Sequence, residues 1–223
     1  LDIAPDGRIF FSEATTRYEM HEWPVEGHEA RGNGRIVCYD PNKGTTRTVL
    51  RGLKFPNGIC VASDGQSILF AETFRCSVSR YWFDGPKAGK VEMVLDNLPG
   101  YPDNINLASD GNYWLAIVGM RCPALDLAWR MPGFRNRMAK RLPLDEWLFP
   151  NINTGCVVKF NEKGEILESF WDLHGANHPM ITSMREHRGH LYLGGIANNR
   201  IGRYKLANAD PDFVQYDKRW GRA

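Results

Sequence analysis

The stretch ICVASDGQSILF, residues 59–70, decides the fold, because its pattern recurs along the chain. Related stretches occupy 1–11 (LDIAPDGRIFF), 105–115 (INLASDGNYWL) and 181–193 (ITSMREHRGHLYL). Each consists of a short alternating strand, a turn and a second apolar strand, which is the pattern of a β-hairpin. Three of the turns contain Asp-Gly, and the fourth contains Arg188-Gly189. The sequence therefore predicts four related hairpins.

A second set of hairpins lies between the first. Their leading strands are predicted at 34–40, 77–82, 155–160 and 200–204. Two hairpins make a four-stranded unit, and a spacing of about 45 to 60 residues suits the blades of a propeller. The fold class predicted is all-β, a β-propeller with about four blades in one domain. The blades are expected near 1–54, 55–98, 99–172 and 173–206, with an insertion at 119–154 and a tail at 207–223.

Composition narrows the function classes. With 43% apolar and 24% charged residues, the 223-residue chain suits one globular domain, and a net charge of +2 gives no reason to expect nucleic-acid binding. Five cysteines without a CxxC pair argue against a zinc site or a fully paired disulfide framework. Cys38, Cys60 and Cys156 lie in apolar runs and are predicted to be buried thiols.

Two polar motifs occupy the same place in successive repeats. Phe55-Pro56-Asn57-Gly58-Ile59 and Tyr101-Pro102-Asp103-Asn104-Ile105 each stand at the entry to a predicted innermost strand, where side chains can converge on a central channel. Asn57, Asp103 and Asn104 offer oxygen donors, which a hard cation such as Ca²⁺ prefers. The alternative is that Pro-Asn-Gly and Pro-Asp-Asn are ordinary turn sequences.

A wider set of residues resembles a known family. The runs 52–59, 70–73, 80–82, 85–90 and 98–105 are similar to the strictosidine synthase-like proteins, relatives of the paraoxonases and gluconolactonases. The resemblance implies a six-bladed propeller in which Asn57, Asp103 and Asn104 match channel calcium ligands. It also implies that about two N-terminal blades precede Leu1, with further ligands in them. By count from the Asp-Gly turn, Leu1 directly follows the place that Asn57-Gly58 fills in the next repeat.

The resemblance also implies three candidate functions. In hydrolytic relatives, calcium acts as a Lewis acid on a lactone or aryl ester, and Asp103 could then be a ligand, a proton acceptor or both. In the alkaloid synthase, a glutamate of the last blade serves a condensation of amine and aldehyde. Thr182 aligns with that glutamate, and a threonine cannot serve as acid or base near neutral pH, which argues against a condensing enzyme. The third candidate is a propeller that keeps calcium for structure alone.

His178 is the second candidate for catalysis besides Asp103. The segment 177–181 is aligned in the last blade with the Pro-Asp-Asn-Ile of the third, and a neutral imidazole could accept a proton. A plain loop role is the alternative. His21 and His28 are expected in a polar inserted loop. No histidine follows the strand 113–119, where hydrolytic relatives keep one, so the paraoxonase mechanism does not carry over whole.

The insertion at 119–154 is predicted to contain two short helices, 121–131 and 134–142, parted by Pro132-Gly133. They combine apolar and basic residues. Three roles are open: a lid that shapes a pocket for an apolar lactone or ester, a membrane-surface contact, or simple packing on the blade rims. The resemblance leaves a secreted, periplasmic or membrane-tethered location open.

Overall fold

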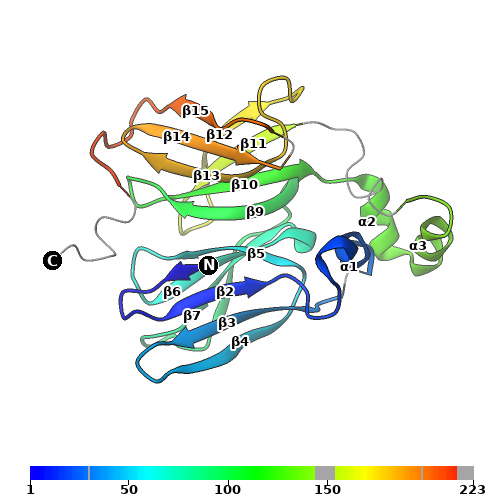
Figure 1. Ribbon diagram of the computed structural model, residues 1–223, viewed down its shortest axis with the longest axis horizontal. Coiled ribbons are helices and arrows are strands. Elements are labelled where there is room, and N and C mark those ends of the chain that lie inside the picture. Colours follow the sequence, from blue (N-terminus) through cyan, green and yellow to red (C-terminus); the bar gives the residue numbers. More distant parts are fainter. Residues whose placement is uncertain (30, 144–153, 197, 215–223) are drawn as a thin grey trace.

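The computed structural model describes residues 1–29, 31–143, 154–196 and 198–214, which form four antiparallel sheets (Figure 1). The first sheet contains β1 (Asp2–Ile3), β2 (Ile9–Glu13), β3 (Gly34–Asp40) and β4 (Thr45–Leu53). The second contains β5 (Pro56–Val61), β6 (Ser67–Glu72), β7 (Ser77–Trp82) and β8 (Val91–Leu95). The third contains β9 (Gly100–Leu107), β10 (Tyr113–Met120), β11 (Gly155–Phe160) and β12 (Ile166–Asp172). The fourth contains β13 (Ile181–His187), β14 (His190–Gly195) and β15 (Gly202–Lys205).

Within every sheet the strands follow one another in chain order, each pairing antiparallel with the next. Such consecutive antiparallel sheets are propeller blades. The predicted all-β fold class is confirmed, and seven of the eight predicted hairpins fall inside one sheet. The hairpin predicted from 200–204 contributes only β15, so the fourth sheet has three strands among the described residues. β1, β5, β9 and β13 are the first strands of their sheets, and across sheet boundaries β5 contacts β1 and β9, and β9 contacts β13.

The turns explain why the repeated glycines are needed. Gly7, Gly65 and Gly111 follow the aspartates of the three Asp-Gly turns with φ of +87°, +66° and +82°, a region open to glycine at little cost. In the fourth sheet the turn has only two residues, Arg188 and Gly189, with φ of +46° and +74°. Positive φ at both central positions matches the right-handed twist of a tight hairpin.

The hydrophobic core lies between adjacent sheets. Phe10 and Ile36 of the first sheet pack with Ile68 and Phe70 of the second. A larger cluster joins the second and third sheets, with Leu69 and Tyr113 fully buried. A third cluster joins Trp114 of the third sheet to Met184 of the fourth. Each sheet is therefore stabilised mainly by its neighbours, as expected for blades.

Polar contacts also join the second and third sheets. The Tyr113 hydroxyl donates to Glu162 at 2.8 Å and accepts from the Ser63 amide at 3.0 Å. Arg80 forms an ion pair with the same Glu162 at 2.8 Å. Burial raises the pKa of Glu162, but the hydrogen bonds from Tyr113 and Arg80 outweigh it and lower that pKa overall. The carboxylate is thus held ionised between the two sheets.

Three short helices gather at one end of the sheets (Figure 1). They are α1 (Trp23–Glu29), preceded by the 3-10 turn η1 (Met20–Glu22), α2 (Pro123–Arg130) and α3 (Pro132–Ala139). The Trp129 indole donates to the Gly27 carbonyl at 2.8 Å, and Arg135 donates to the Glu29 carbonyl at 3.0 Å. The inserted segments of the first and third sheets therefore pack on each other.

Two expectations for these segments are corrected. α3 begins at Pro132 rather than after Gly133, because proline at the first helical position loses no hydrogen bond. His28 does not lie in a solvated loop: it is 4% exposed in α1, and burial lowers its pKa. Of the insertion at 119–154, residues 144–153 lie outside the described residues, as do residues 215–223 of the predicted tail.

All five cysteines are buried as thiols, which agrees with the prediction for Cys38, Cys60 and Cys156. A second short helix of the 3-10 type, η2 (Thr73–Arg75), follows β6. Within the described residues, no helix has the length and apolar character needed to cross a membrane.

Candidate functional site

The two polar motifs lie at matching irregularities of their strands. In β5, Pro56 pairs with Glu72 and Ile59 with Phe70, so Asn57 and Gly58 together oppose one residue of β6. In β9, Pro102 pairs with Ile117 and Ile105 with Leu115, so Asp103 and Asn104 together oppose one residue of β10. Two residues facing one define a β-bulge, which redirects side chains and is frequent beside active sites.

The innermost strand of the fourth sheet has a bulge at the same level. Ile181 pairs with Gly195 and Ser183 with Gly194, which leaves Thr182 as the additional residue of β13. The Asn104 side chain donates to the Thr182 carbonyl at 2.8 Å, so these two residues are level across the sheet boundary. Three successive innermost strands are therefore bulged at one height.

Gly58 explains how closely the second and third sheets meet there. A Cβ at Gly58 would lie 2.4 Å from the Asp103 carbonyl oxygen and 2.6 Å from the Ile105 nitrogen. Real Cβ atoms do not approach backbone atoms so closely, so only glycine fits at this contact. The glycine brings the backbone of the first motif against that of the second.

The three predicted ligands come together around one carboxylate. Asp103 is 8% exposed, and burial raises its pKa to about 7, while a hydrogen bond from the Asn57 side chain opposes that rise. The Asn104 amide nitrogen donates to Asp103 Oδ1 at 3.0 Å. Asn57, Asp103 and Asn104 therefore form one cluster, although they come from two sheets.

The cluster has the donor chemistry of a hard-cation site. Within the described part of the chain, no charged side chain contributes to the pKa shift of Asp103, so its negative charge has no cationic partner there. No group of three or more His, Cys, Asp or Glu side chains that could hold a metal occurs among the described residues either. A divalent cation would compensate the buried carboxylate, and amide and carboxylate oxygens suit Ca²⁺. The Asn104 amide nitrogen donates to Asp103 and to the Thr182 carbonyl, which leaves the side-chain oxygen of Asn104 as a candidate ligand beside Asn57 and Asp103.

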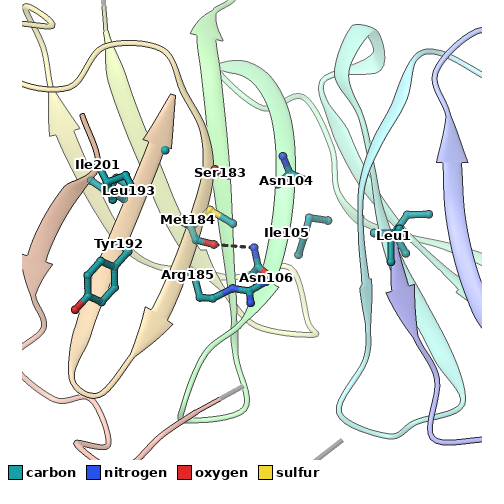
Figure 2. A pocket seen from close by; sticks show the side chains of 12 residues that line it. Leu1, Asn104, Ile105, Asn106, Ser183, Met184, Arg185, Tyr192, Leu193 and Ile201 are labelled. Atoms are coloured by element: carbon teal, nitrogen blue, oxygen red, sulfur yellow. Dashed lines mark hydrogen bonds between the residues drawn. The ribbon is translucent and has the colours of Figure 1, made fainter. Parts of the chain in front are cut away.

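A cavity of about 360 Å³ extends along the channel beside the cluster (Figure 2). Its walls include Leu1, which precedes β1, Ile59 of β5, Ile105 of β9 and Met184 of β13. The Asn106 amide donates to the Met184 carbonyl at 2.7 Å and ties the third sheet to the fourth (Figure 2). The lining is mixed, since apolar side chains alternate with polar ones, namely Asn104, Asn106, Ser183, Arg185 and Tyr192.

His178 lies in a different place. It borders a second cavity of about 410 Å³ between β11 and β12 on one side and β13 to β15 on the other, and Asp103 is not among the residues that line it. The side chain is 7% exposed, its backbone amide donates to Asp172 at 2.8 Å, and its Nε2 has no hydrogen-bond partner among the described residues. Thr182 lies next to Asn104 across the sheet boundary, so the bulge of β13 matches that of the second polar motif. The segment 177–181 comes earlier in the repeat than this bulge. The structure does not bring Asp103 and His178 together.

Two hydroxyl groups that the sequence analysis did not single out contact the bulges. Ser12 of β2 donates to the Asn57 carbonyl at 2.6 Å, and Thr73 of η2 donates to the Pro102 carbonyl at 2.8 Å. Phe11 and Phe70 end the matching stretches of the first and second repeats. Ser12 directly follows Phe11, whereas two residues separate Thr73 from Phe70. The two hydroxyl groups therefore do not occupy matching places of the repeat. The repeats therefore gave no signal for them.

Comparison with known proteins agrees with this architecture. The family model for strictosidine synthase matches residues 1–86. The chain is 36% identical to "Protein STRICTOSIDINE SYNTHASE-LIKE 13" of Arabidopsis thaliana, over 90% of this chain and 48% of the relative. It is 32% identical to "Adipocyte plasma membrane-associated protein" of Salmo salar, over 93% of this chain and 51% of that relative. The chain thus spans about half the length of the curated relatives it matches.

A solved structure shares the fold at low sequence identity. The calcium-binding protein regucalcin from Agrobacterium tumefaciens superposes with a TM-score of 0.55 and 13% identity, covering 96% of this chain and 61% of that one. The β-propeller fold is common to both.

Proposed function

Because this chain belongs to the strictosidine synthase-like family, we propose that the intact protein is a calcium-dependent hydrolase of lactones or aryl esters. One observation carries the proposal: a buried carboxylate, Asp103, lies among the amide side chains of Asn57 and Asn104, and Asn104 lines the channel cavity. The description of the structural relative regucalcin as calcium-binding is consistent with a cation in this fold.

The residues of the cluster would bind the cation and orient one another. Asn57, Asp103 and Asn104 would hold the cation through their side-chain oxygens, and the Asn104 amide nitrogen also orients the Asp103 carboxylate through its hydrogen bond. The chemistry that bound calcium supplies is Lewis acidity toward an ester carbonyl. Without a bound cation, burial raises the pKa of Asp103 to about 7; a cation would favour its ionised form, so we assign Asp103 first to holding the cation.

The channel walls favour an apolar acyl or aryl group. Ile59, Ile105 and Met184 line the cavity beside Asn104 and would exclude water from the bound substrate. A cavity of this size that combines apolar walls with polar groups is typical of small-molecule binding.

The test is a panel of lactones and aryl esters assayed with the intact protein, with calcium and with a chelator. We expect hydrolysis that disappears on chelation and returns with added Ca²⁺. Asp103→Asn should lower kcat/KM at least about a hundredfold, since it removes the charge that holds the cation. The absence of turnover on every member of the panel would rule out the hydrolase.

A non-catalytic propeller that binds calcium for stability is the second candidate. The position of His178 favours it, because none of the described residues that line the channel cavity is a histidine. Calcium-dependent melting without turnover would distinguish this candidate from the hydrolase. A condensing enzyme has less support, since Thr182 offers a hydroxyl where that chemistry needs an acid or base.

A further inference from the structure

The bulged strands are joined to their neighbours by a repeated kind of contact. Ser12 of the first sheet donates to the Asn57 carbonyl of the second, and Thr73, which follows the second, donates to the Pro102 carbonyl of the third. Asn104 of the third sheet donates to the Thr182 carbonyl of the fourth. We refer to these three hydrogen bonds as the inter-sheet bonds. Each runs from one sheet to a carbonyl at, or directly before, the bulge of the next.

Bulges make these contacts necessary. An extra residue interrupts the ladder and leaves backbone groups there without their regular partners. A buried carbonyl without a hydrogen bond is costly, so a side chain must reach it. Thr73 is 5% exposed and Pro102 is buried, so water has little access to that bond.

The carbonyls concerned belong to the candidate cation site. Asn57 is one of the candidate ligands, and Pro102 directly precedes another, Asp103. Fixing the carbonyl of a residue fixes the plane of the peptide that follows it, and thus the direction of the neighbouring side chain. The backbone contact at Gly58 leaves no room for either strand to adjust independently.

We infer that Ser12 and Thr73 are positioning residues for the candidate cation site, each holding one ligand-bearing bulge from the neighbouring sheet. The calcium part of this inference rests on the proposed function. The geometric part does not, because it concerns how firmly the bulges are held in the metal-free protein. The two hydroxyls need not touch a ligand or a substrate to act in this way.

The variants are chosen to remove only the hydroxyl. Ser12→Ala and Thr73→Val delete the donor with little change of volume, and Thr73→Ser keeps it. Ser77→Ala is the matched control, since Ser77 is fully buried in β7 and its hydroxyl has no hydrogen-bond partner among the described residues. If Ser12→Ala does not fold, Ser12→Cys, which keeps a weaker donor, replaces it.

Two measurements on the intact protein test the inference. Hydrogen exchange without calcium should be faster at 57–59 in Ser12→Ala and at 102–105 in Thr73→Val, with other strands unchanged. Isothermal titration with CaCl₂ should show affinity weakened by about three- to tenfold in both variants, the loss of one neutral hydrogen bond. Ser77→Ala and Thr73→Ser should behave as the wild type in both measurements.

The outcomes separate the two proposals. Unchanged exchange together with unchanged affinity would overturn the inference, and so would equal effects in Ser77→Ala. If the wild type binds no calcium, the proposed function fails, and hydrogen exchange alone tests the positioning role of Ser12 and Thr73. Faster exchange at the two bulges in the variants would support that role. Unchanged exchange would contradict it.

Discussion

Asp103 combines deep burial with the absence of a cationic partner among the described residues. Burial raises its pKa from the ordinary 3.8 to about 7, against the hydrogen bond from Asn57. The folded protein therefore keeps the proton at pH values where the unfolded chain has lost it. The stability linked to this proton is fully present below the unfolded pKa and is lost as pH rises toward 7.

This linkage gives a prediction for metal-free protein. Between about pH 4 and 7, the free energy of unfolding should fall by about 4 kcal/mol more in the wild type than in Asp103→Asn, at about 1.4 kcal/mol per pKa unit. Urea unfolding of both proteins in chelator, across that pH range, measures the difference. Added calcium should reduce it, because a cation stabilises the ionised carboxylate. If the free energy of unfolding changed with pH equally in the wild type and in Asp103→Asn, the pKa of Asp103 would not be raised by folding.

At the scale of single elements, α2 contributes more to packing than to a movable lid. Leu125 and Ala128 are fully buried, and Trp129 lies edge-on to Phe74, with ring centroids 6.4 Å apart. Phe74 in turn lies 4.9 Å from Phe55, next to the first polar motif. A chain of aromatic contacts therefore connects the helix to the entry of the channel.

Trp129→Ala should lower the free energy of unfolding by about 2–4 kcal/mol, because it leaves a cavity and removes the hydrogen bond to Gly27. Leu127→Ala is the control on the same helix, since Leu127 is 43% exposed and should change stability little. Chemical denaturation measures both. Wild-type stability in Trp129→Ala, with an altered substrate range, would instead support the lid.

The end of α2, together with α3 and the residues after it, presents a different surface. Arg130, Arg137, Lys140 and Arg141 are exposed, together with Met131 and Leu142. Exposed cations beside apolar side chains suit the headgroup region of an anionic membrane. Membrane contact, one of the three roles that the sequence left open, therefore remains a prediction for this surface.

Vesicle sedimentation tests that contact. Binding to phosphatidylserine vesicles should weaken at least about fivefold in the double variant Lys140→Glu, Arg141→Glu, and should fall with salt. Neutral phosphatidylcholine vesicles are the control. Equal binding of wild type and variant to both kinds of vesicle would exclude α3 and the residues after it as the contact.

The sequence predicted the strands and turns better than the β-bulges that interrupt the strands. The Asp-Gly turns and alternating strands located the hairpins, because turn chemistry and side-chain alternation are local properties. The bulges at Asn57 and Asp103 depend on pairing with distant strands, and Ser12 and Thr73 act across sheet boundaries, so no local pattern revealed them. The alignment of His178 with the second motif failed for a related reason: the bulge at Thr182 shows that the segment before β13 stands earlier in the repeat.

At the scale of the whole molecule, stability comes from contacts between sheets. Tyr113 and Arg80 meet at Glu162, so one carboxylate joins the second sheet to the third. Glu162→Gln should lower the free energy of unfolding by about 1–3 kcal/mol, the range for hydrogen bonds to a charged group. Glu92→Gln is the control, because Glu92 pairs with Lys87 within one sheet. Equal melting temperatures for the two variants would contradict this role of Glu162.

The cation site is tested most directly by calcium titration of the intact protein and of Asp103→Asn with isothermal calorimetry. We predict saturable calcium binding by the wild type and its loss in a folded Asp103→Asn variant. Equal affinity in the two proteins would contradict the assignment of the site to Asp103, and the absence of binding by the wild type would contradict the calcium site altogether.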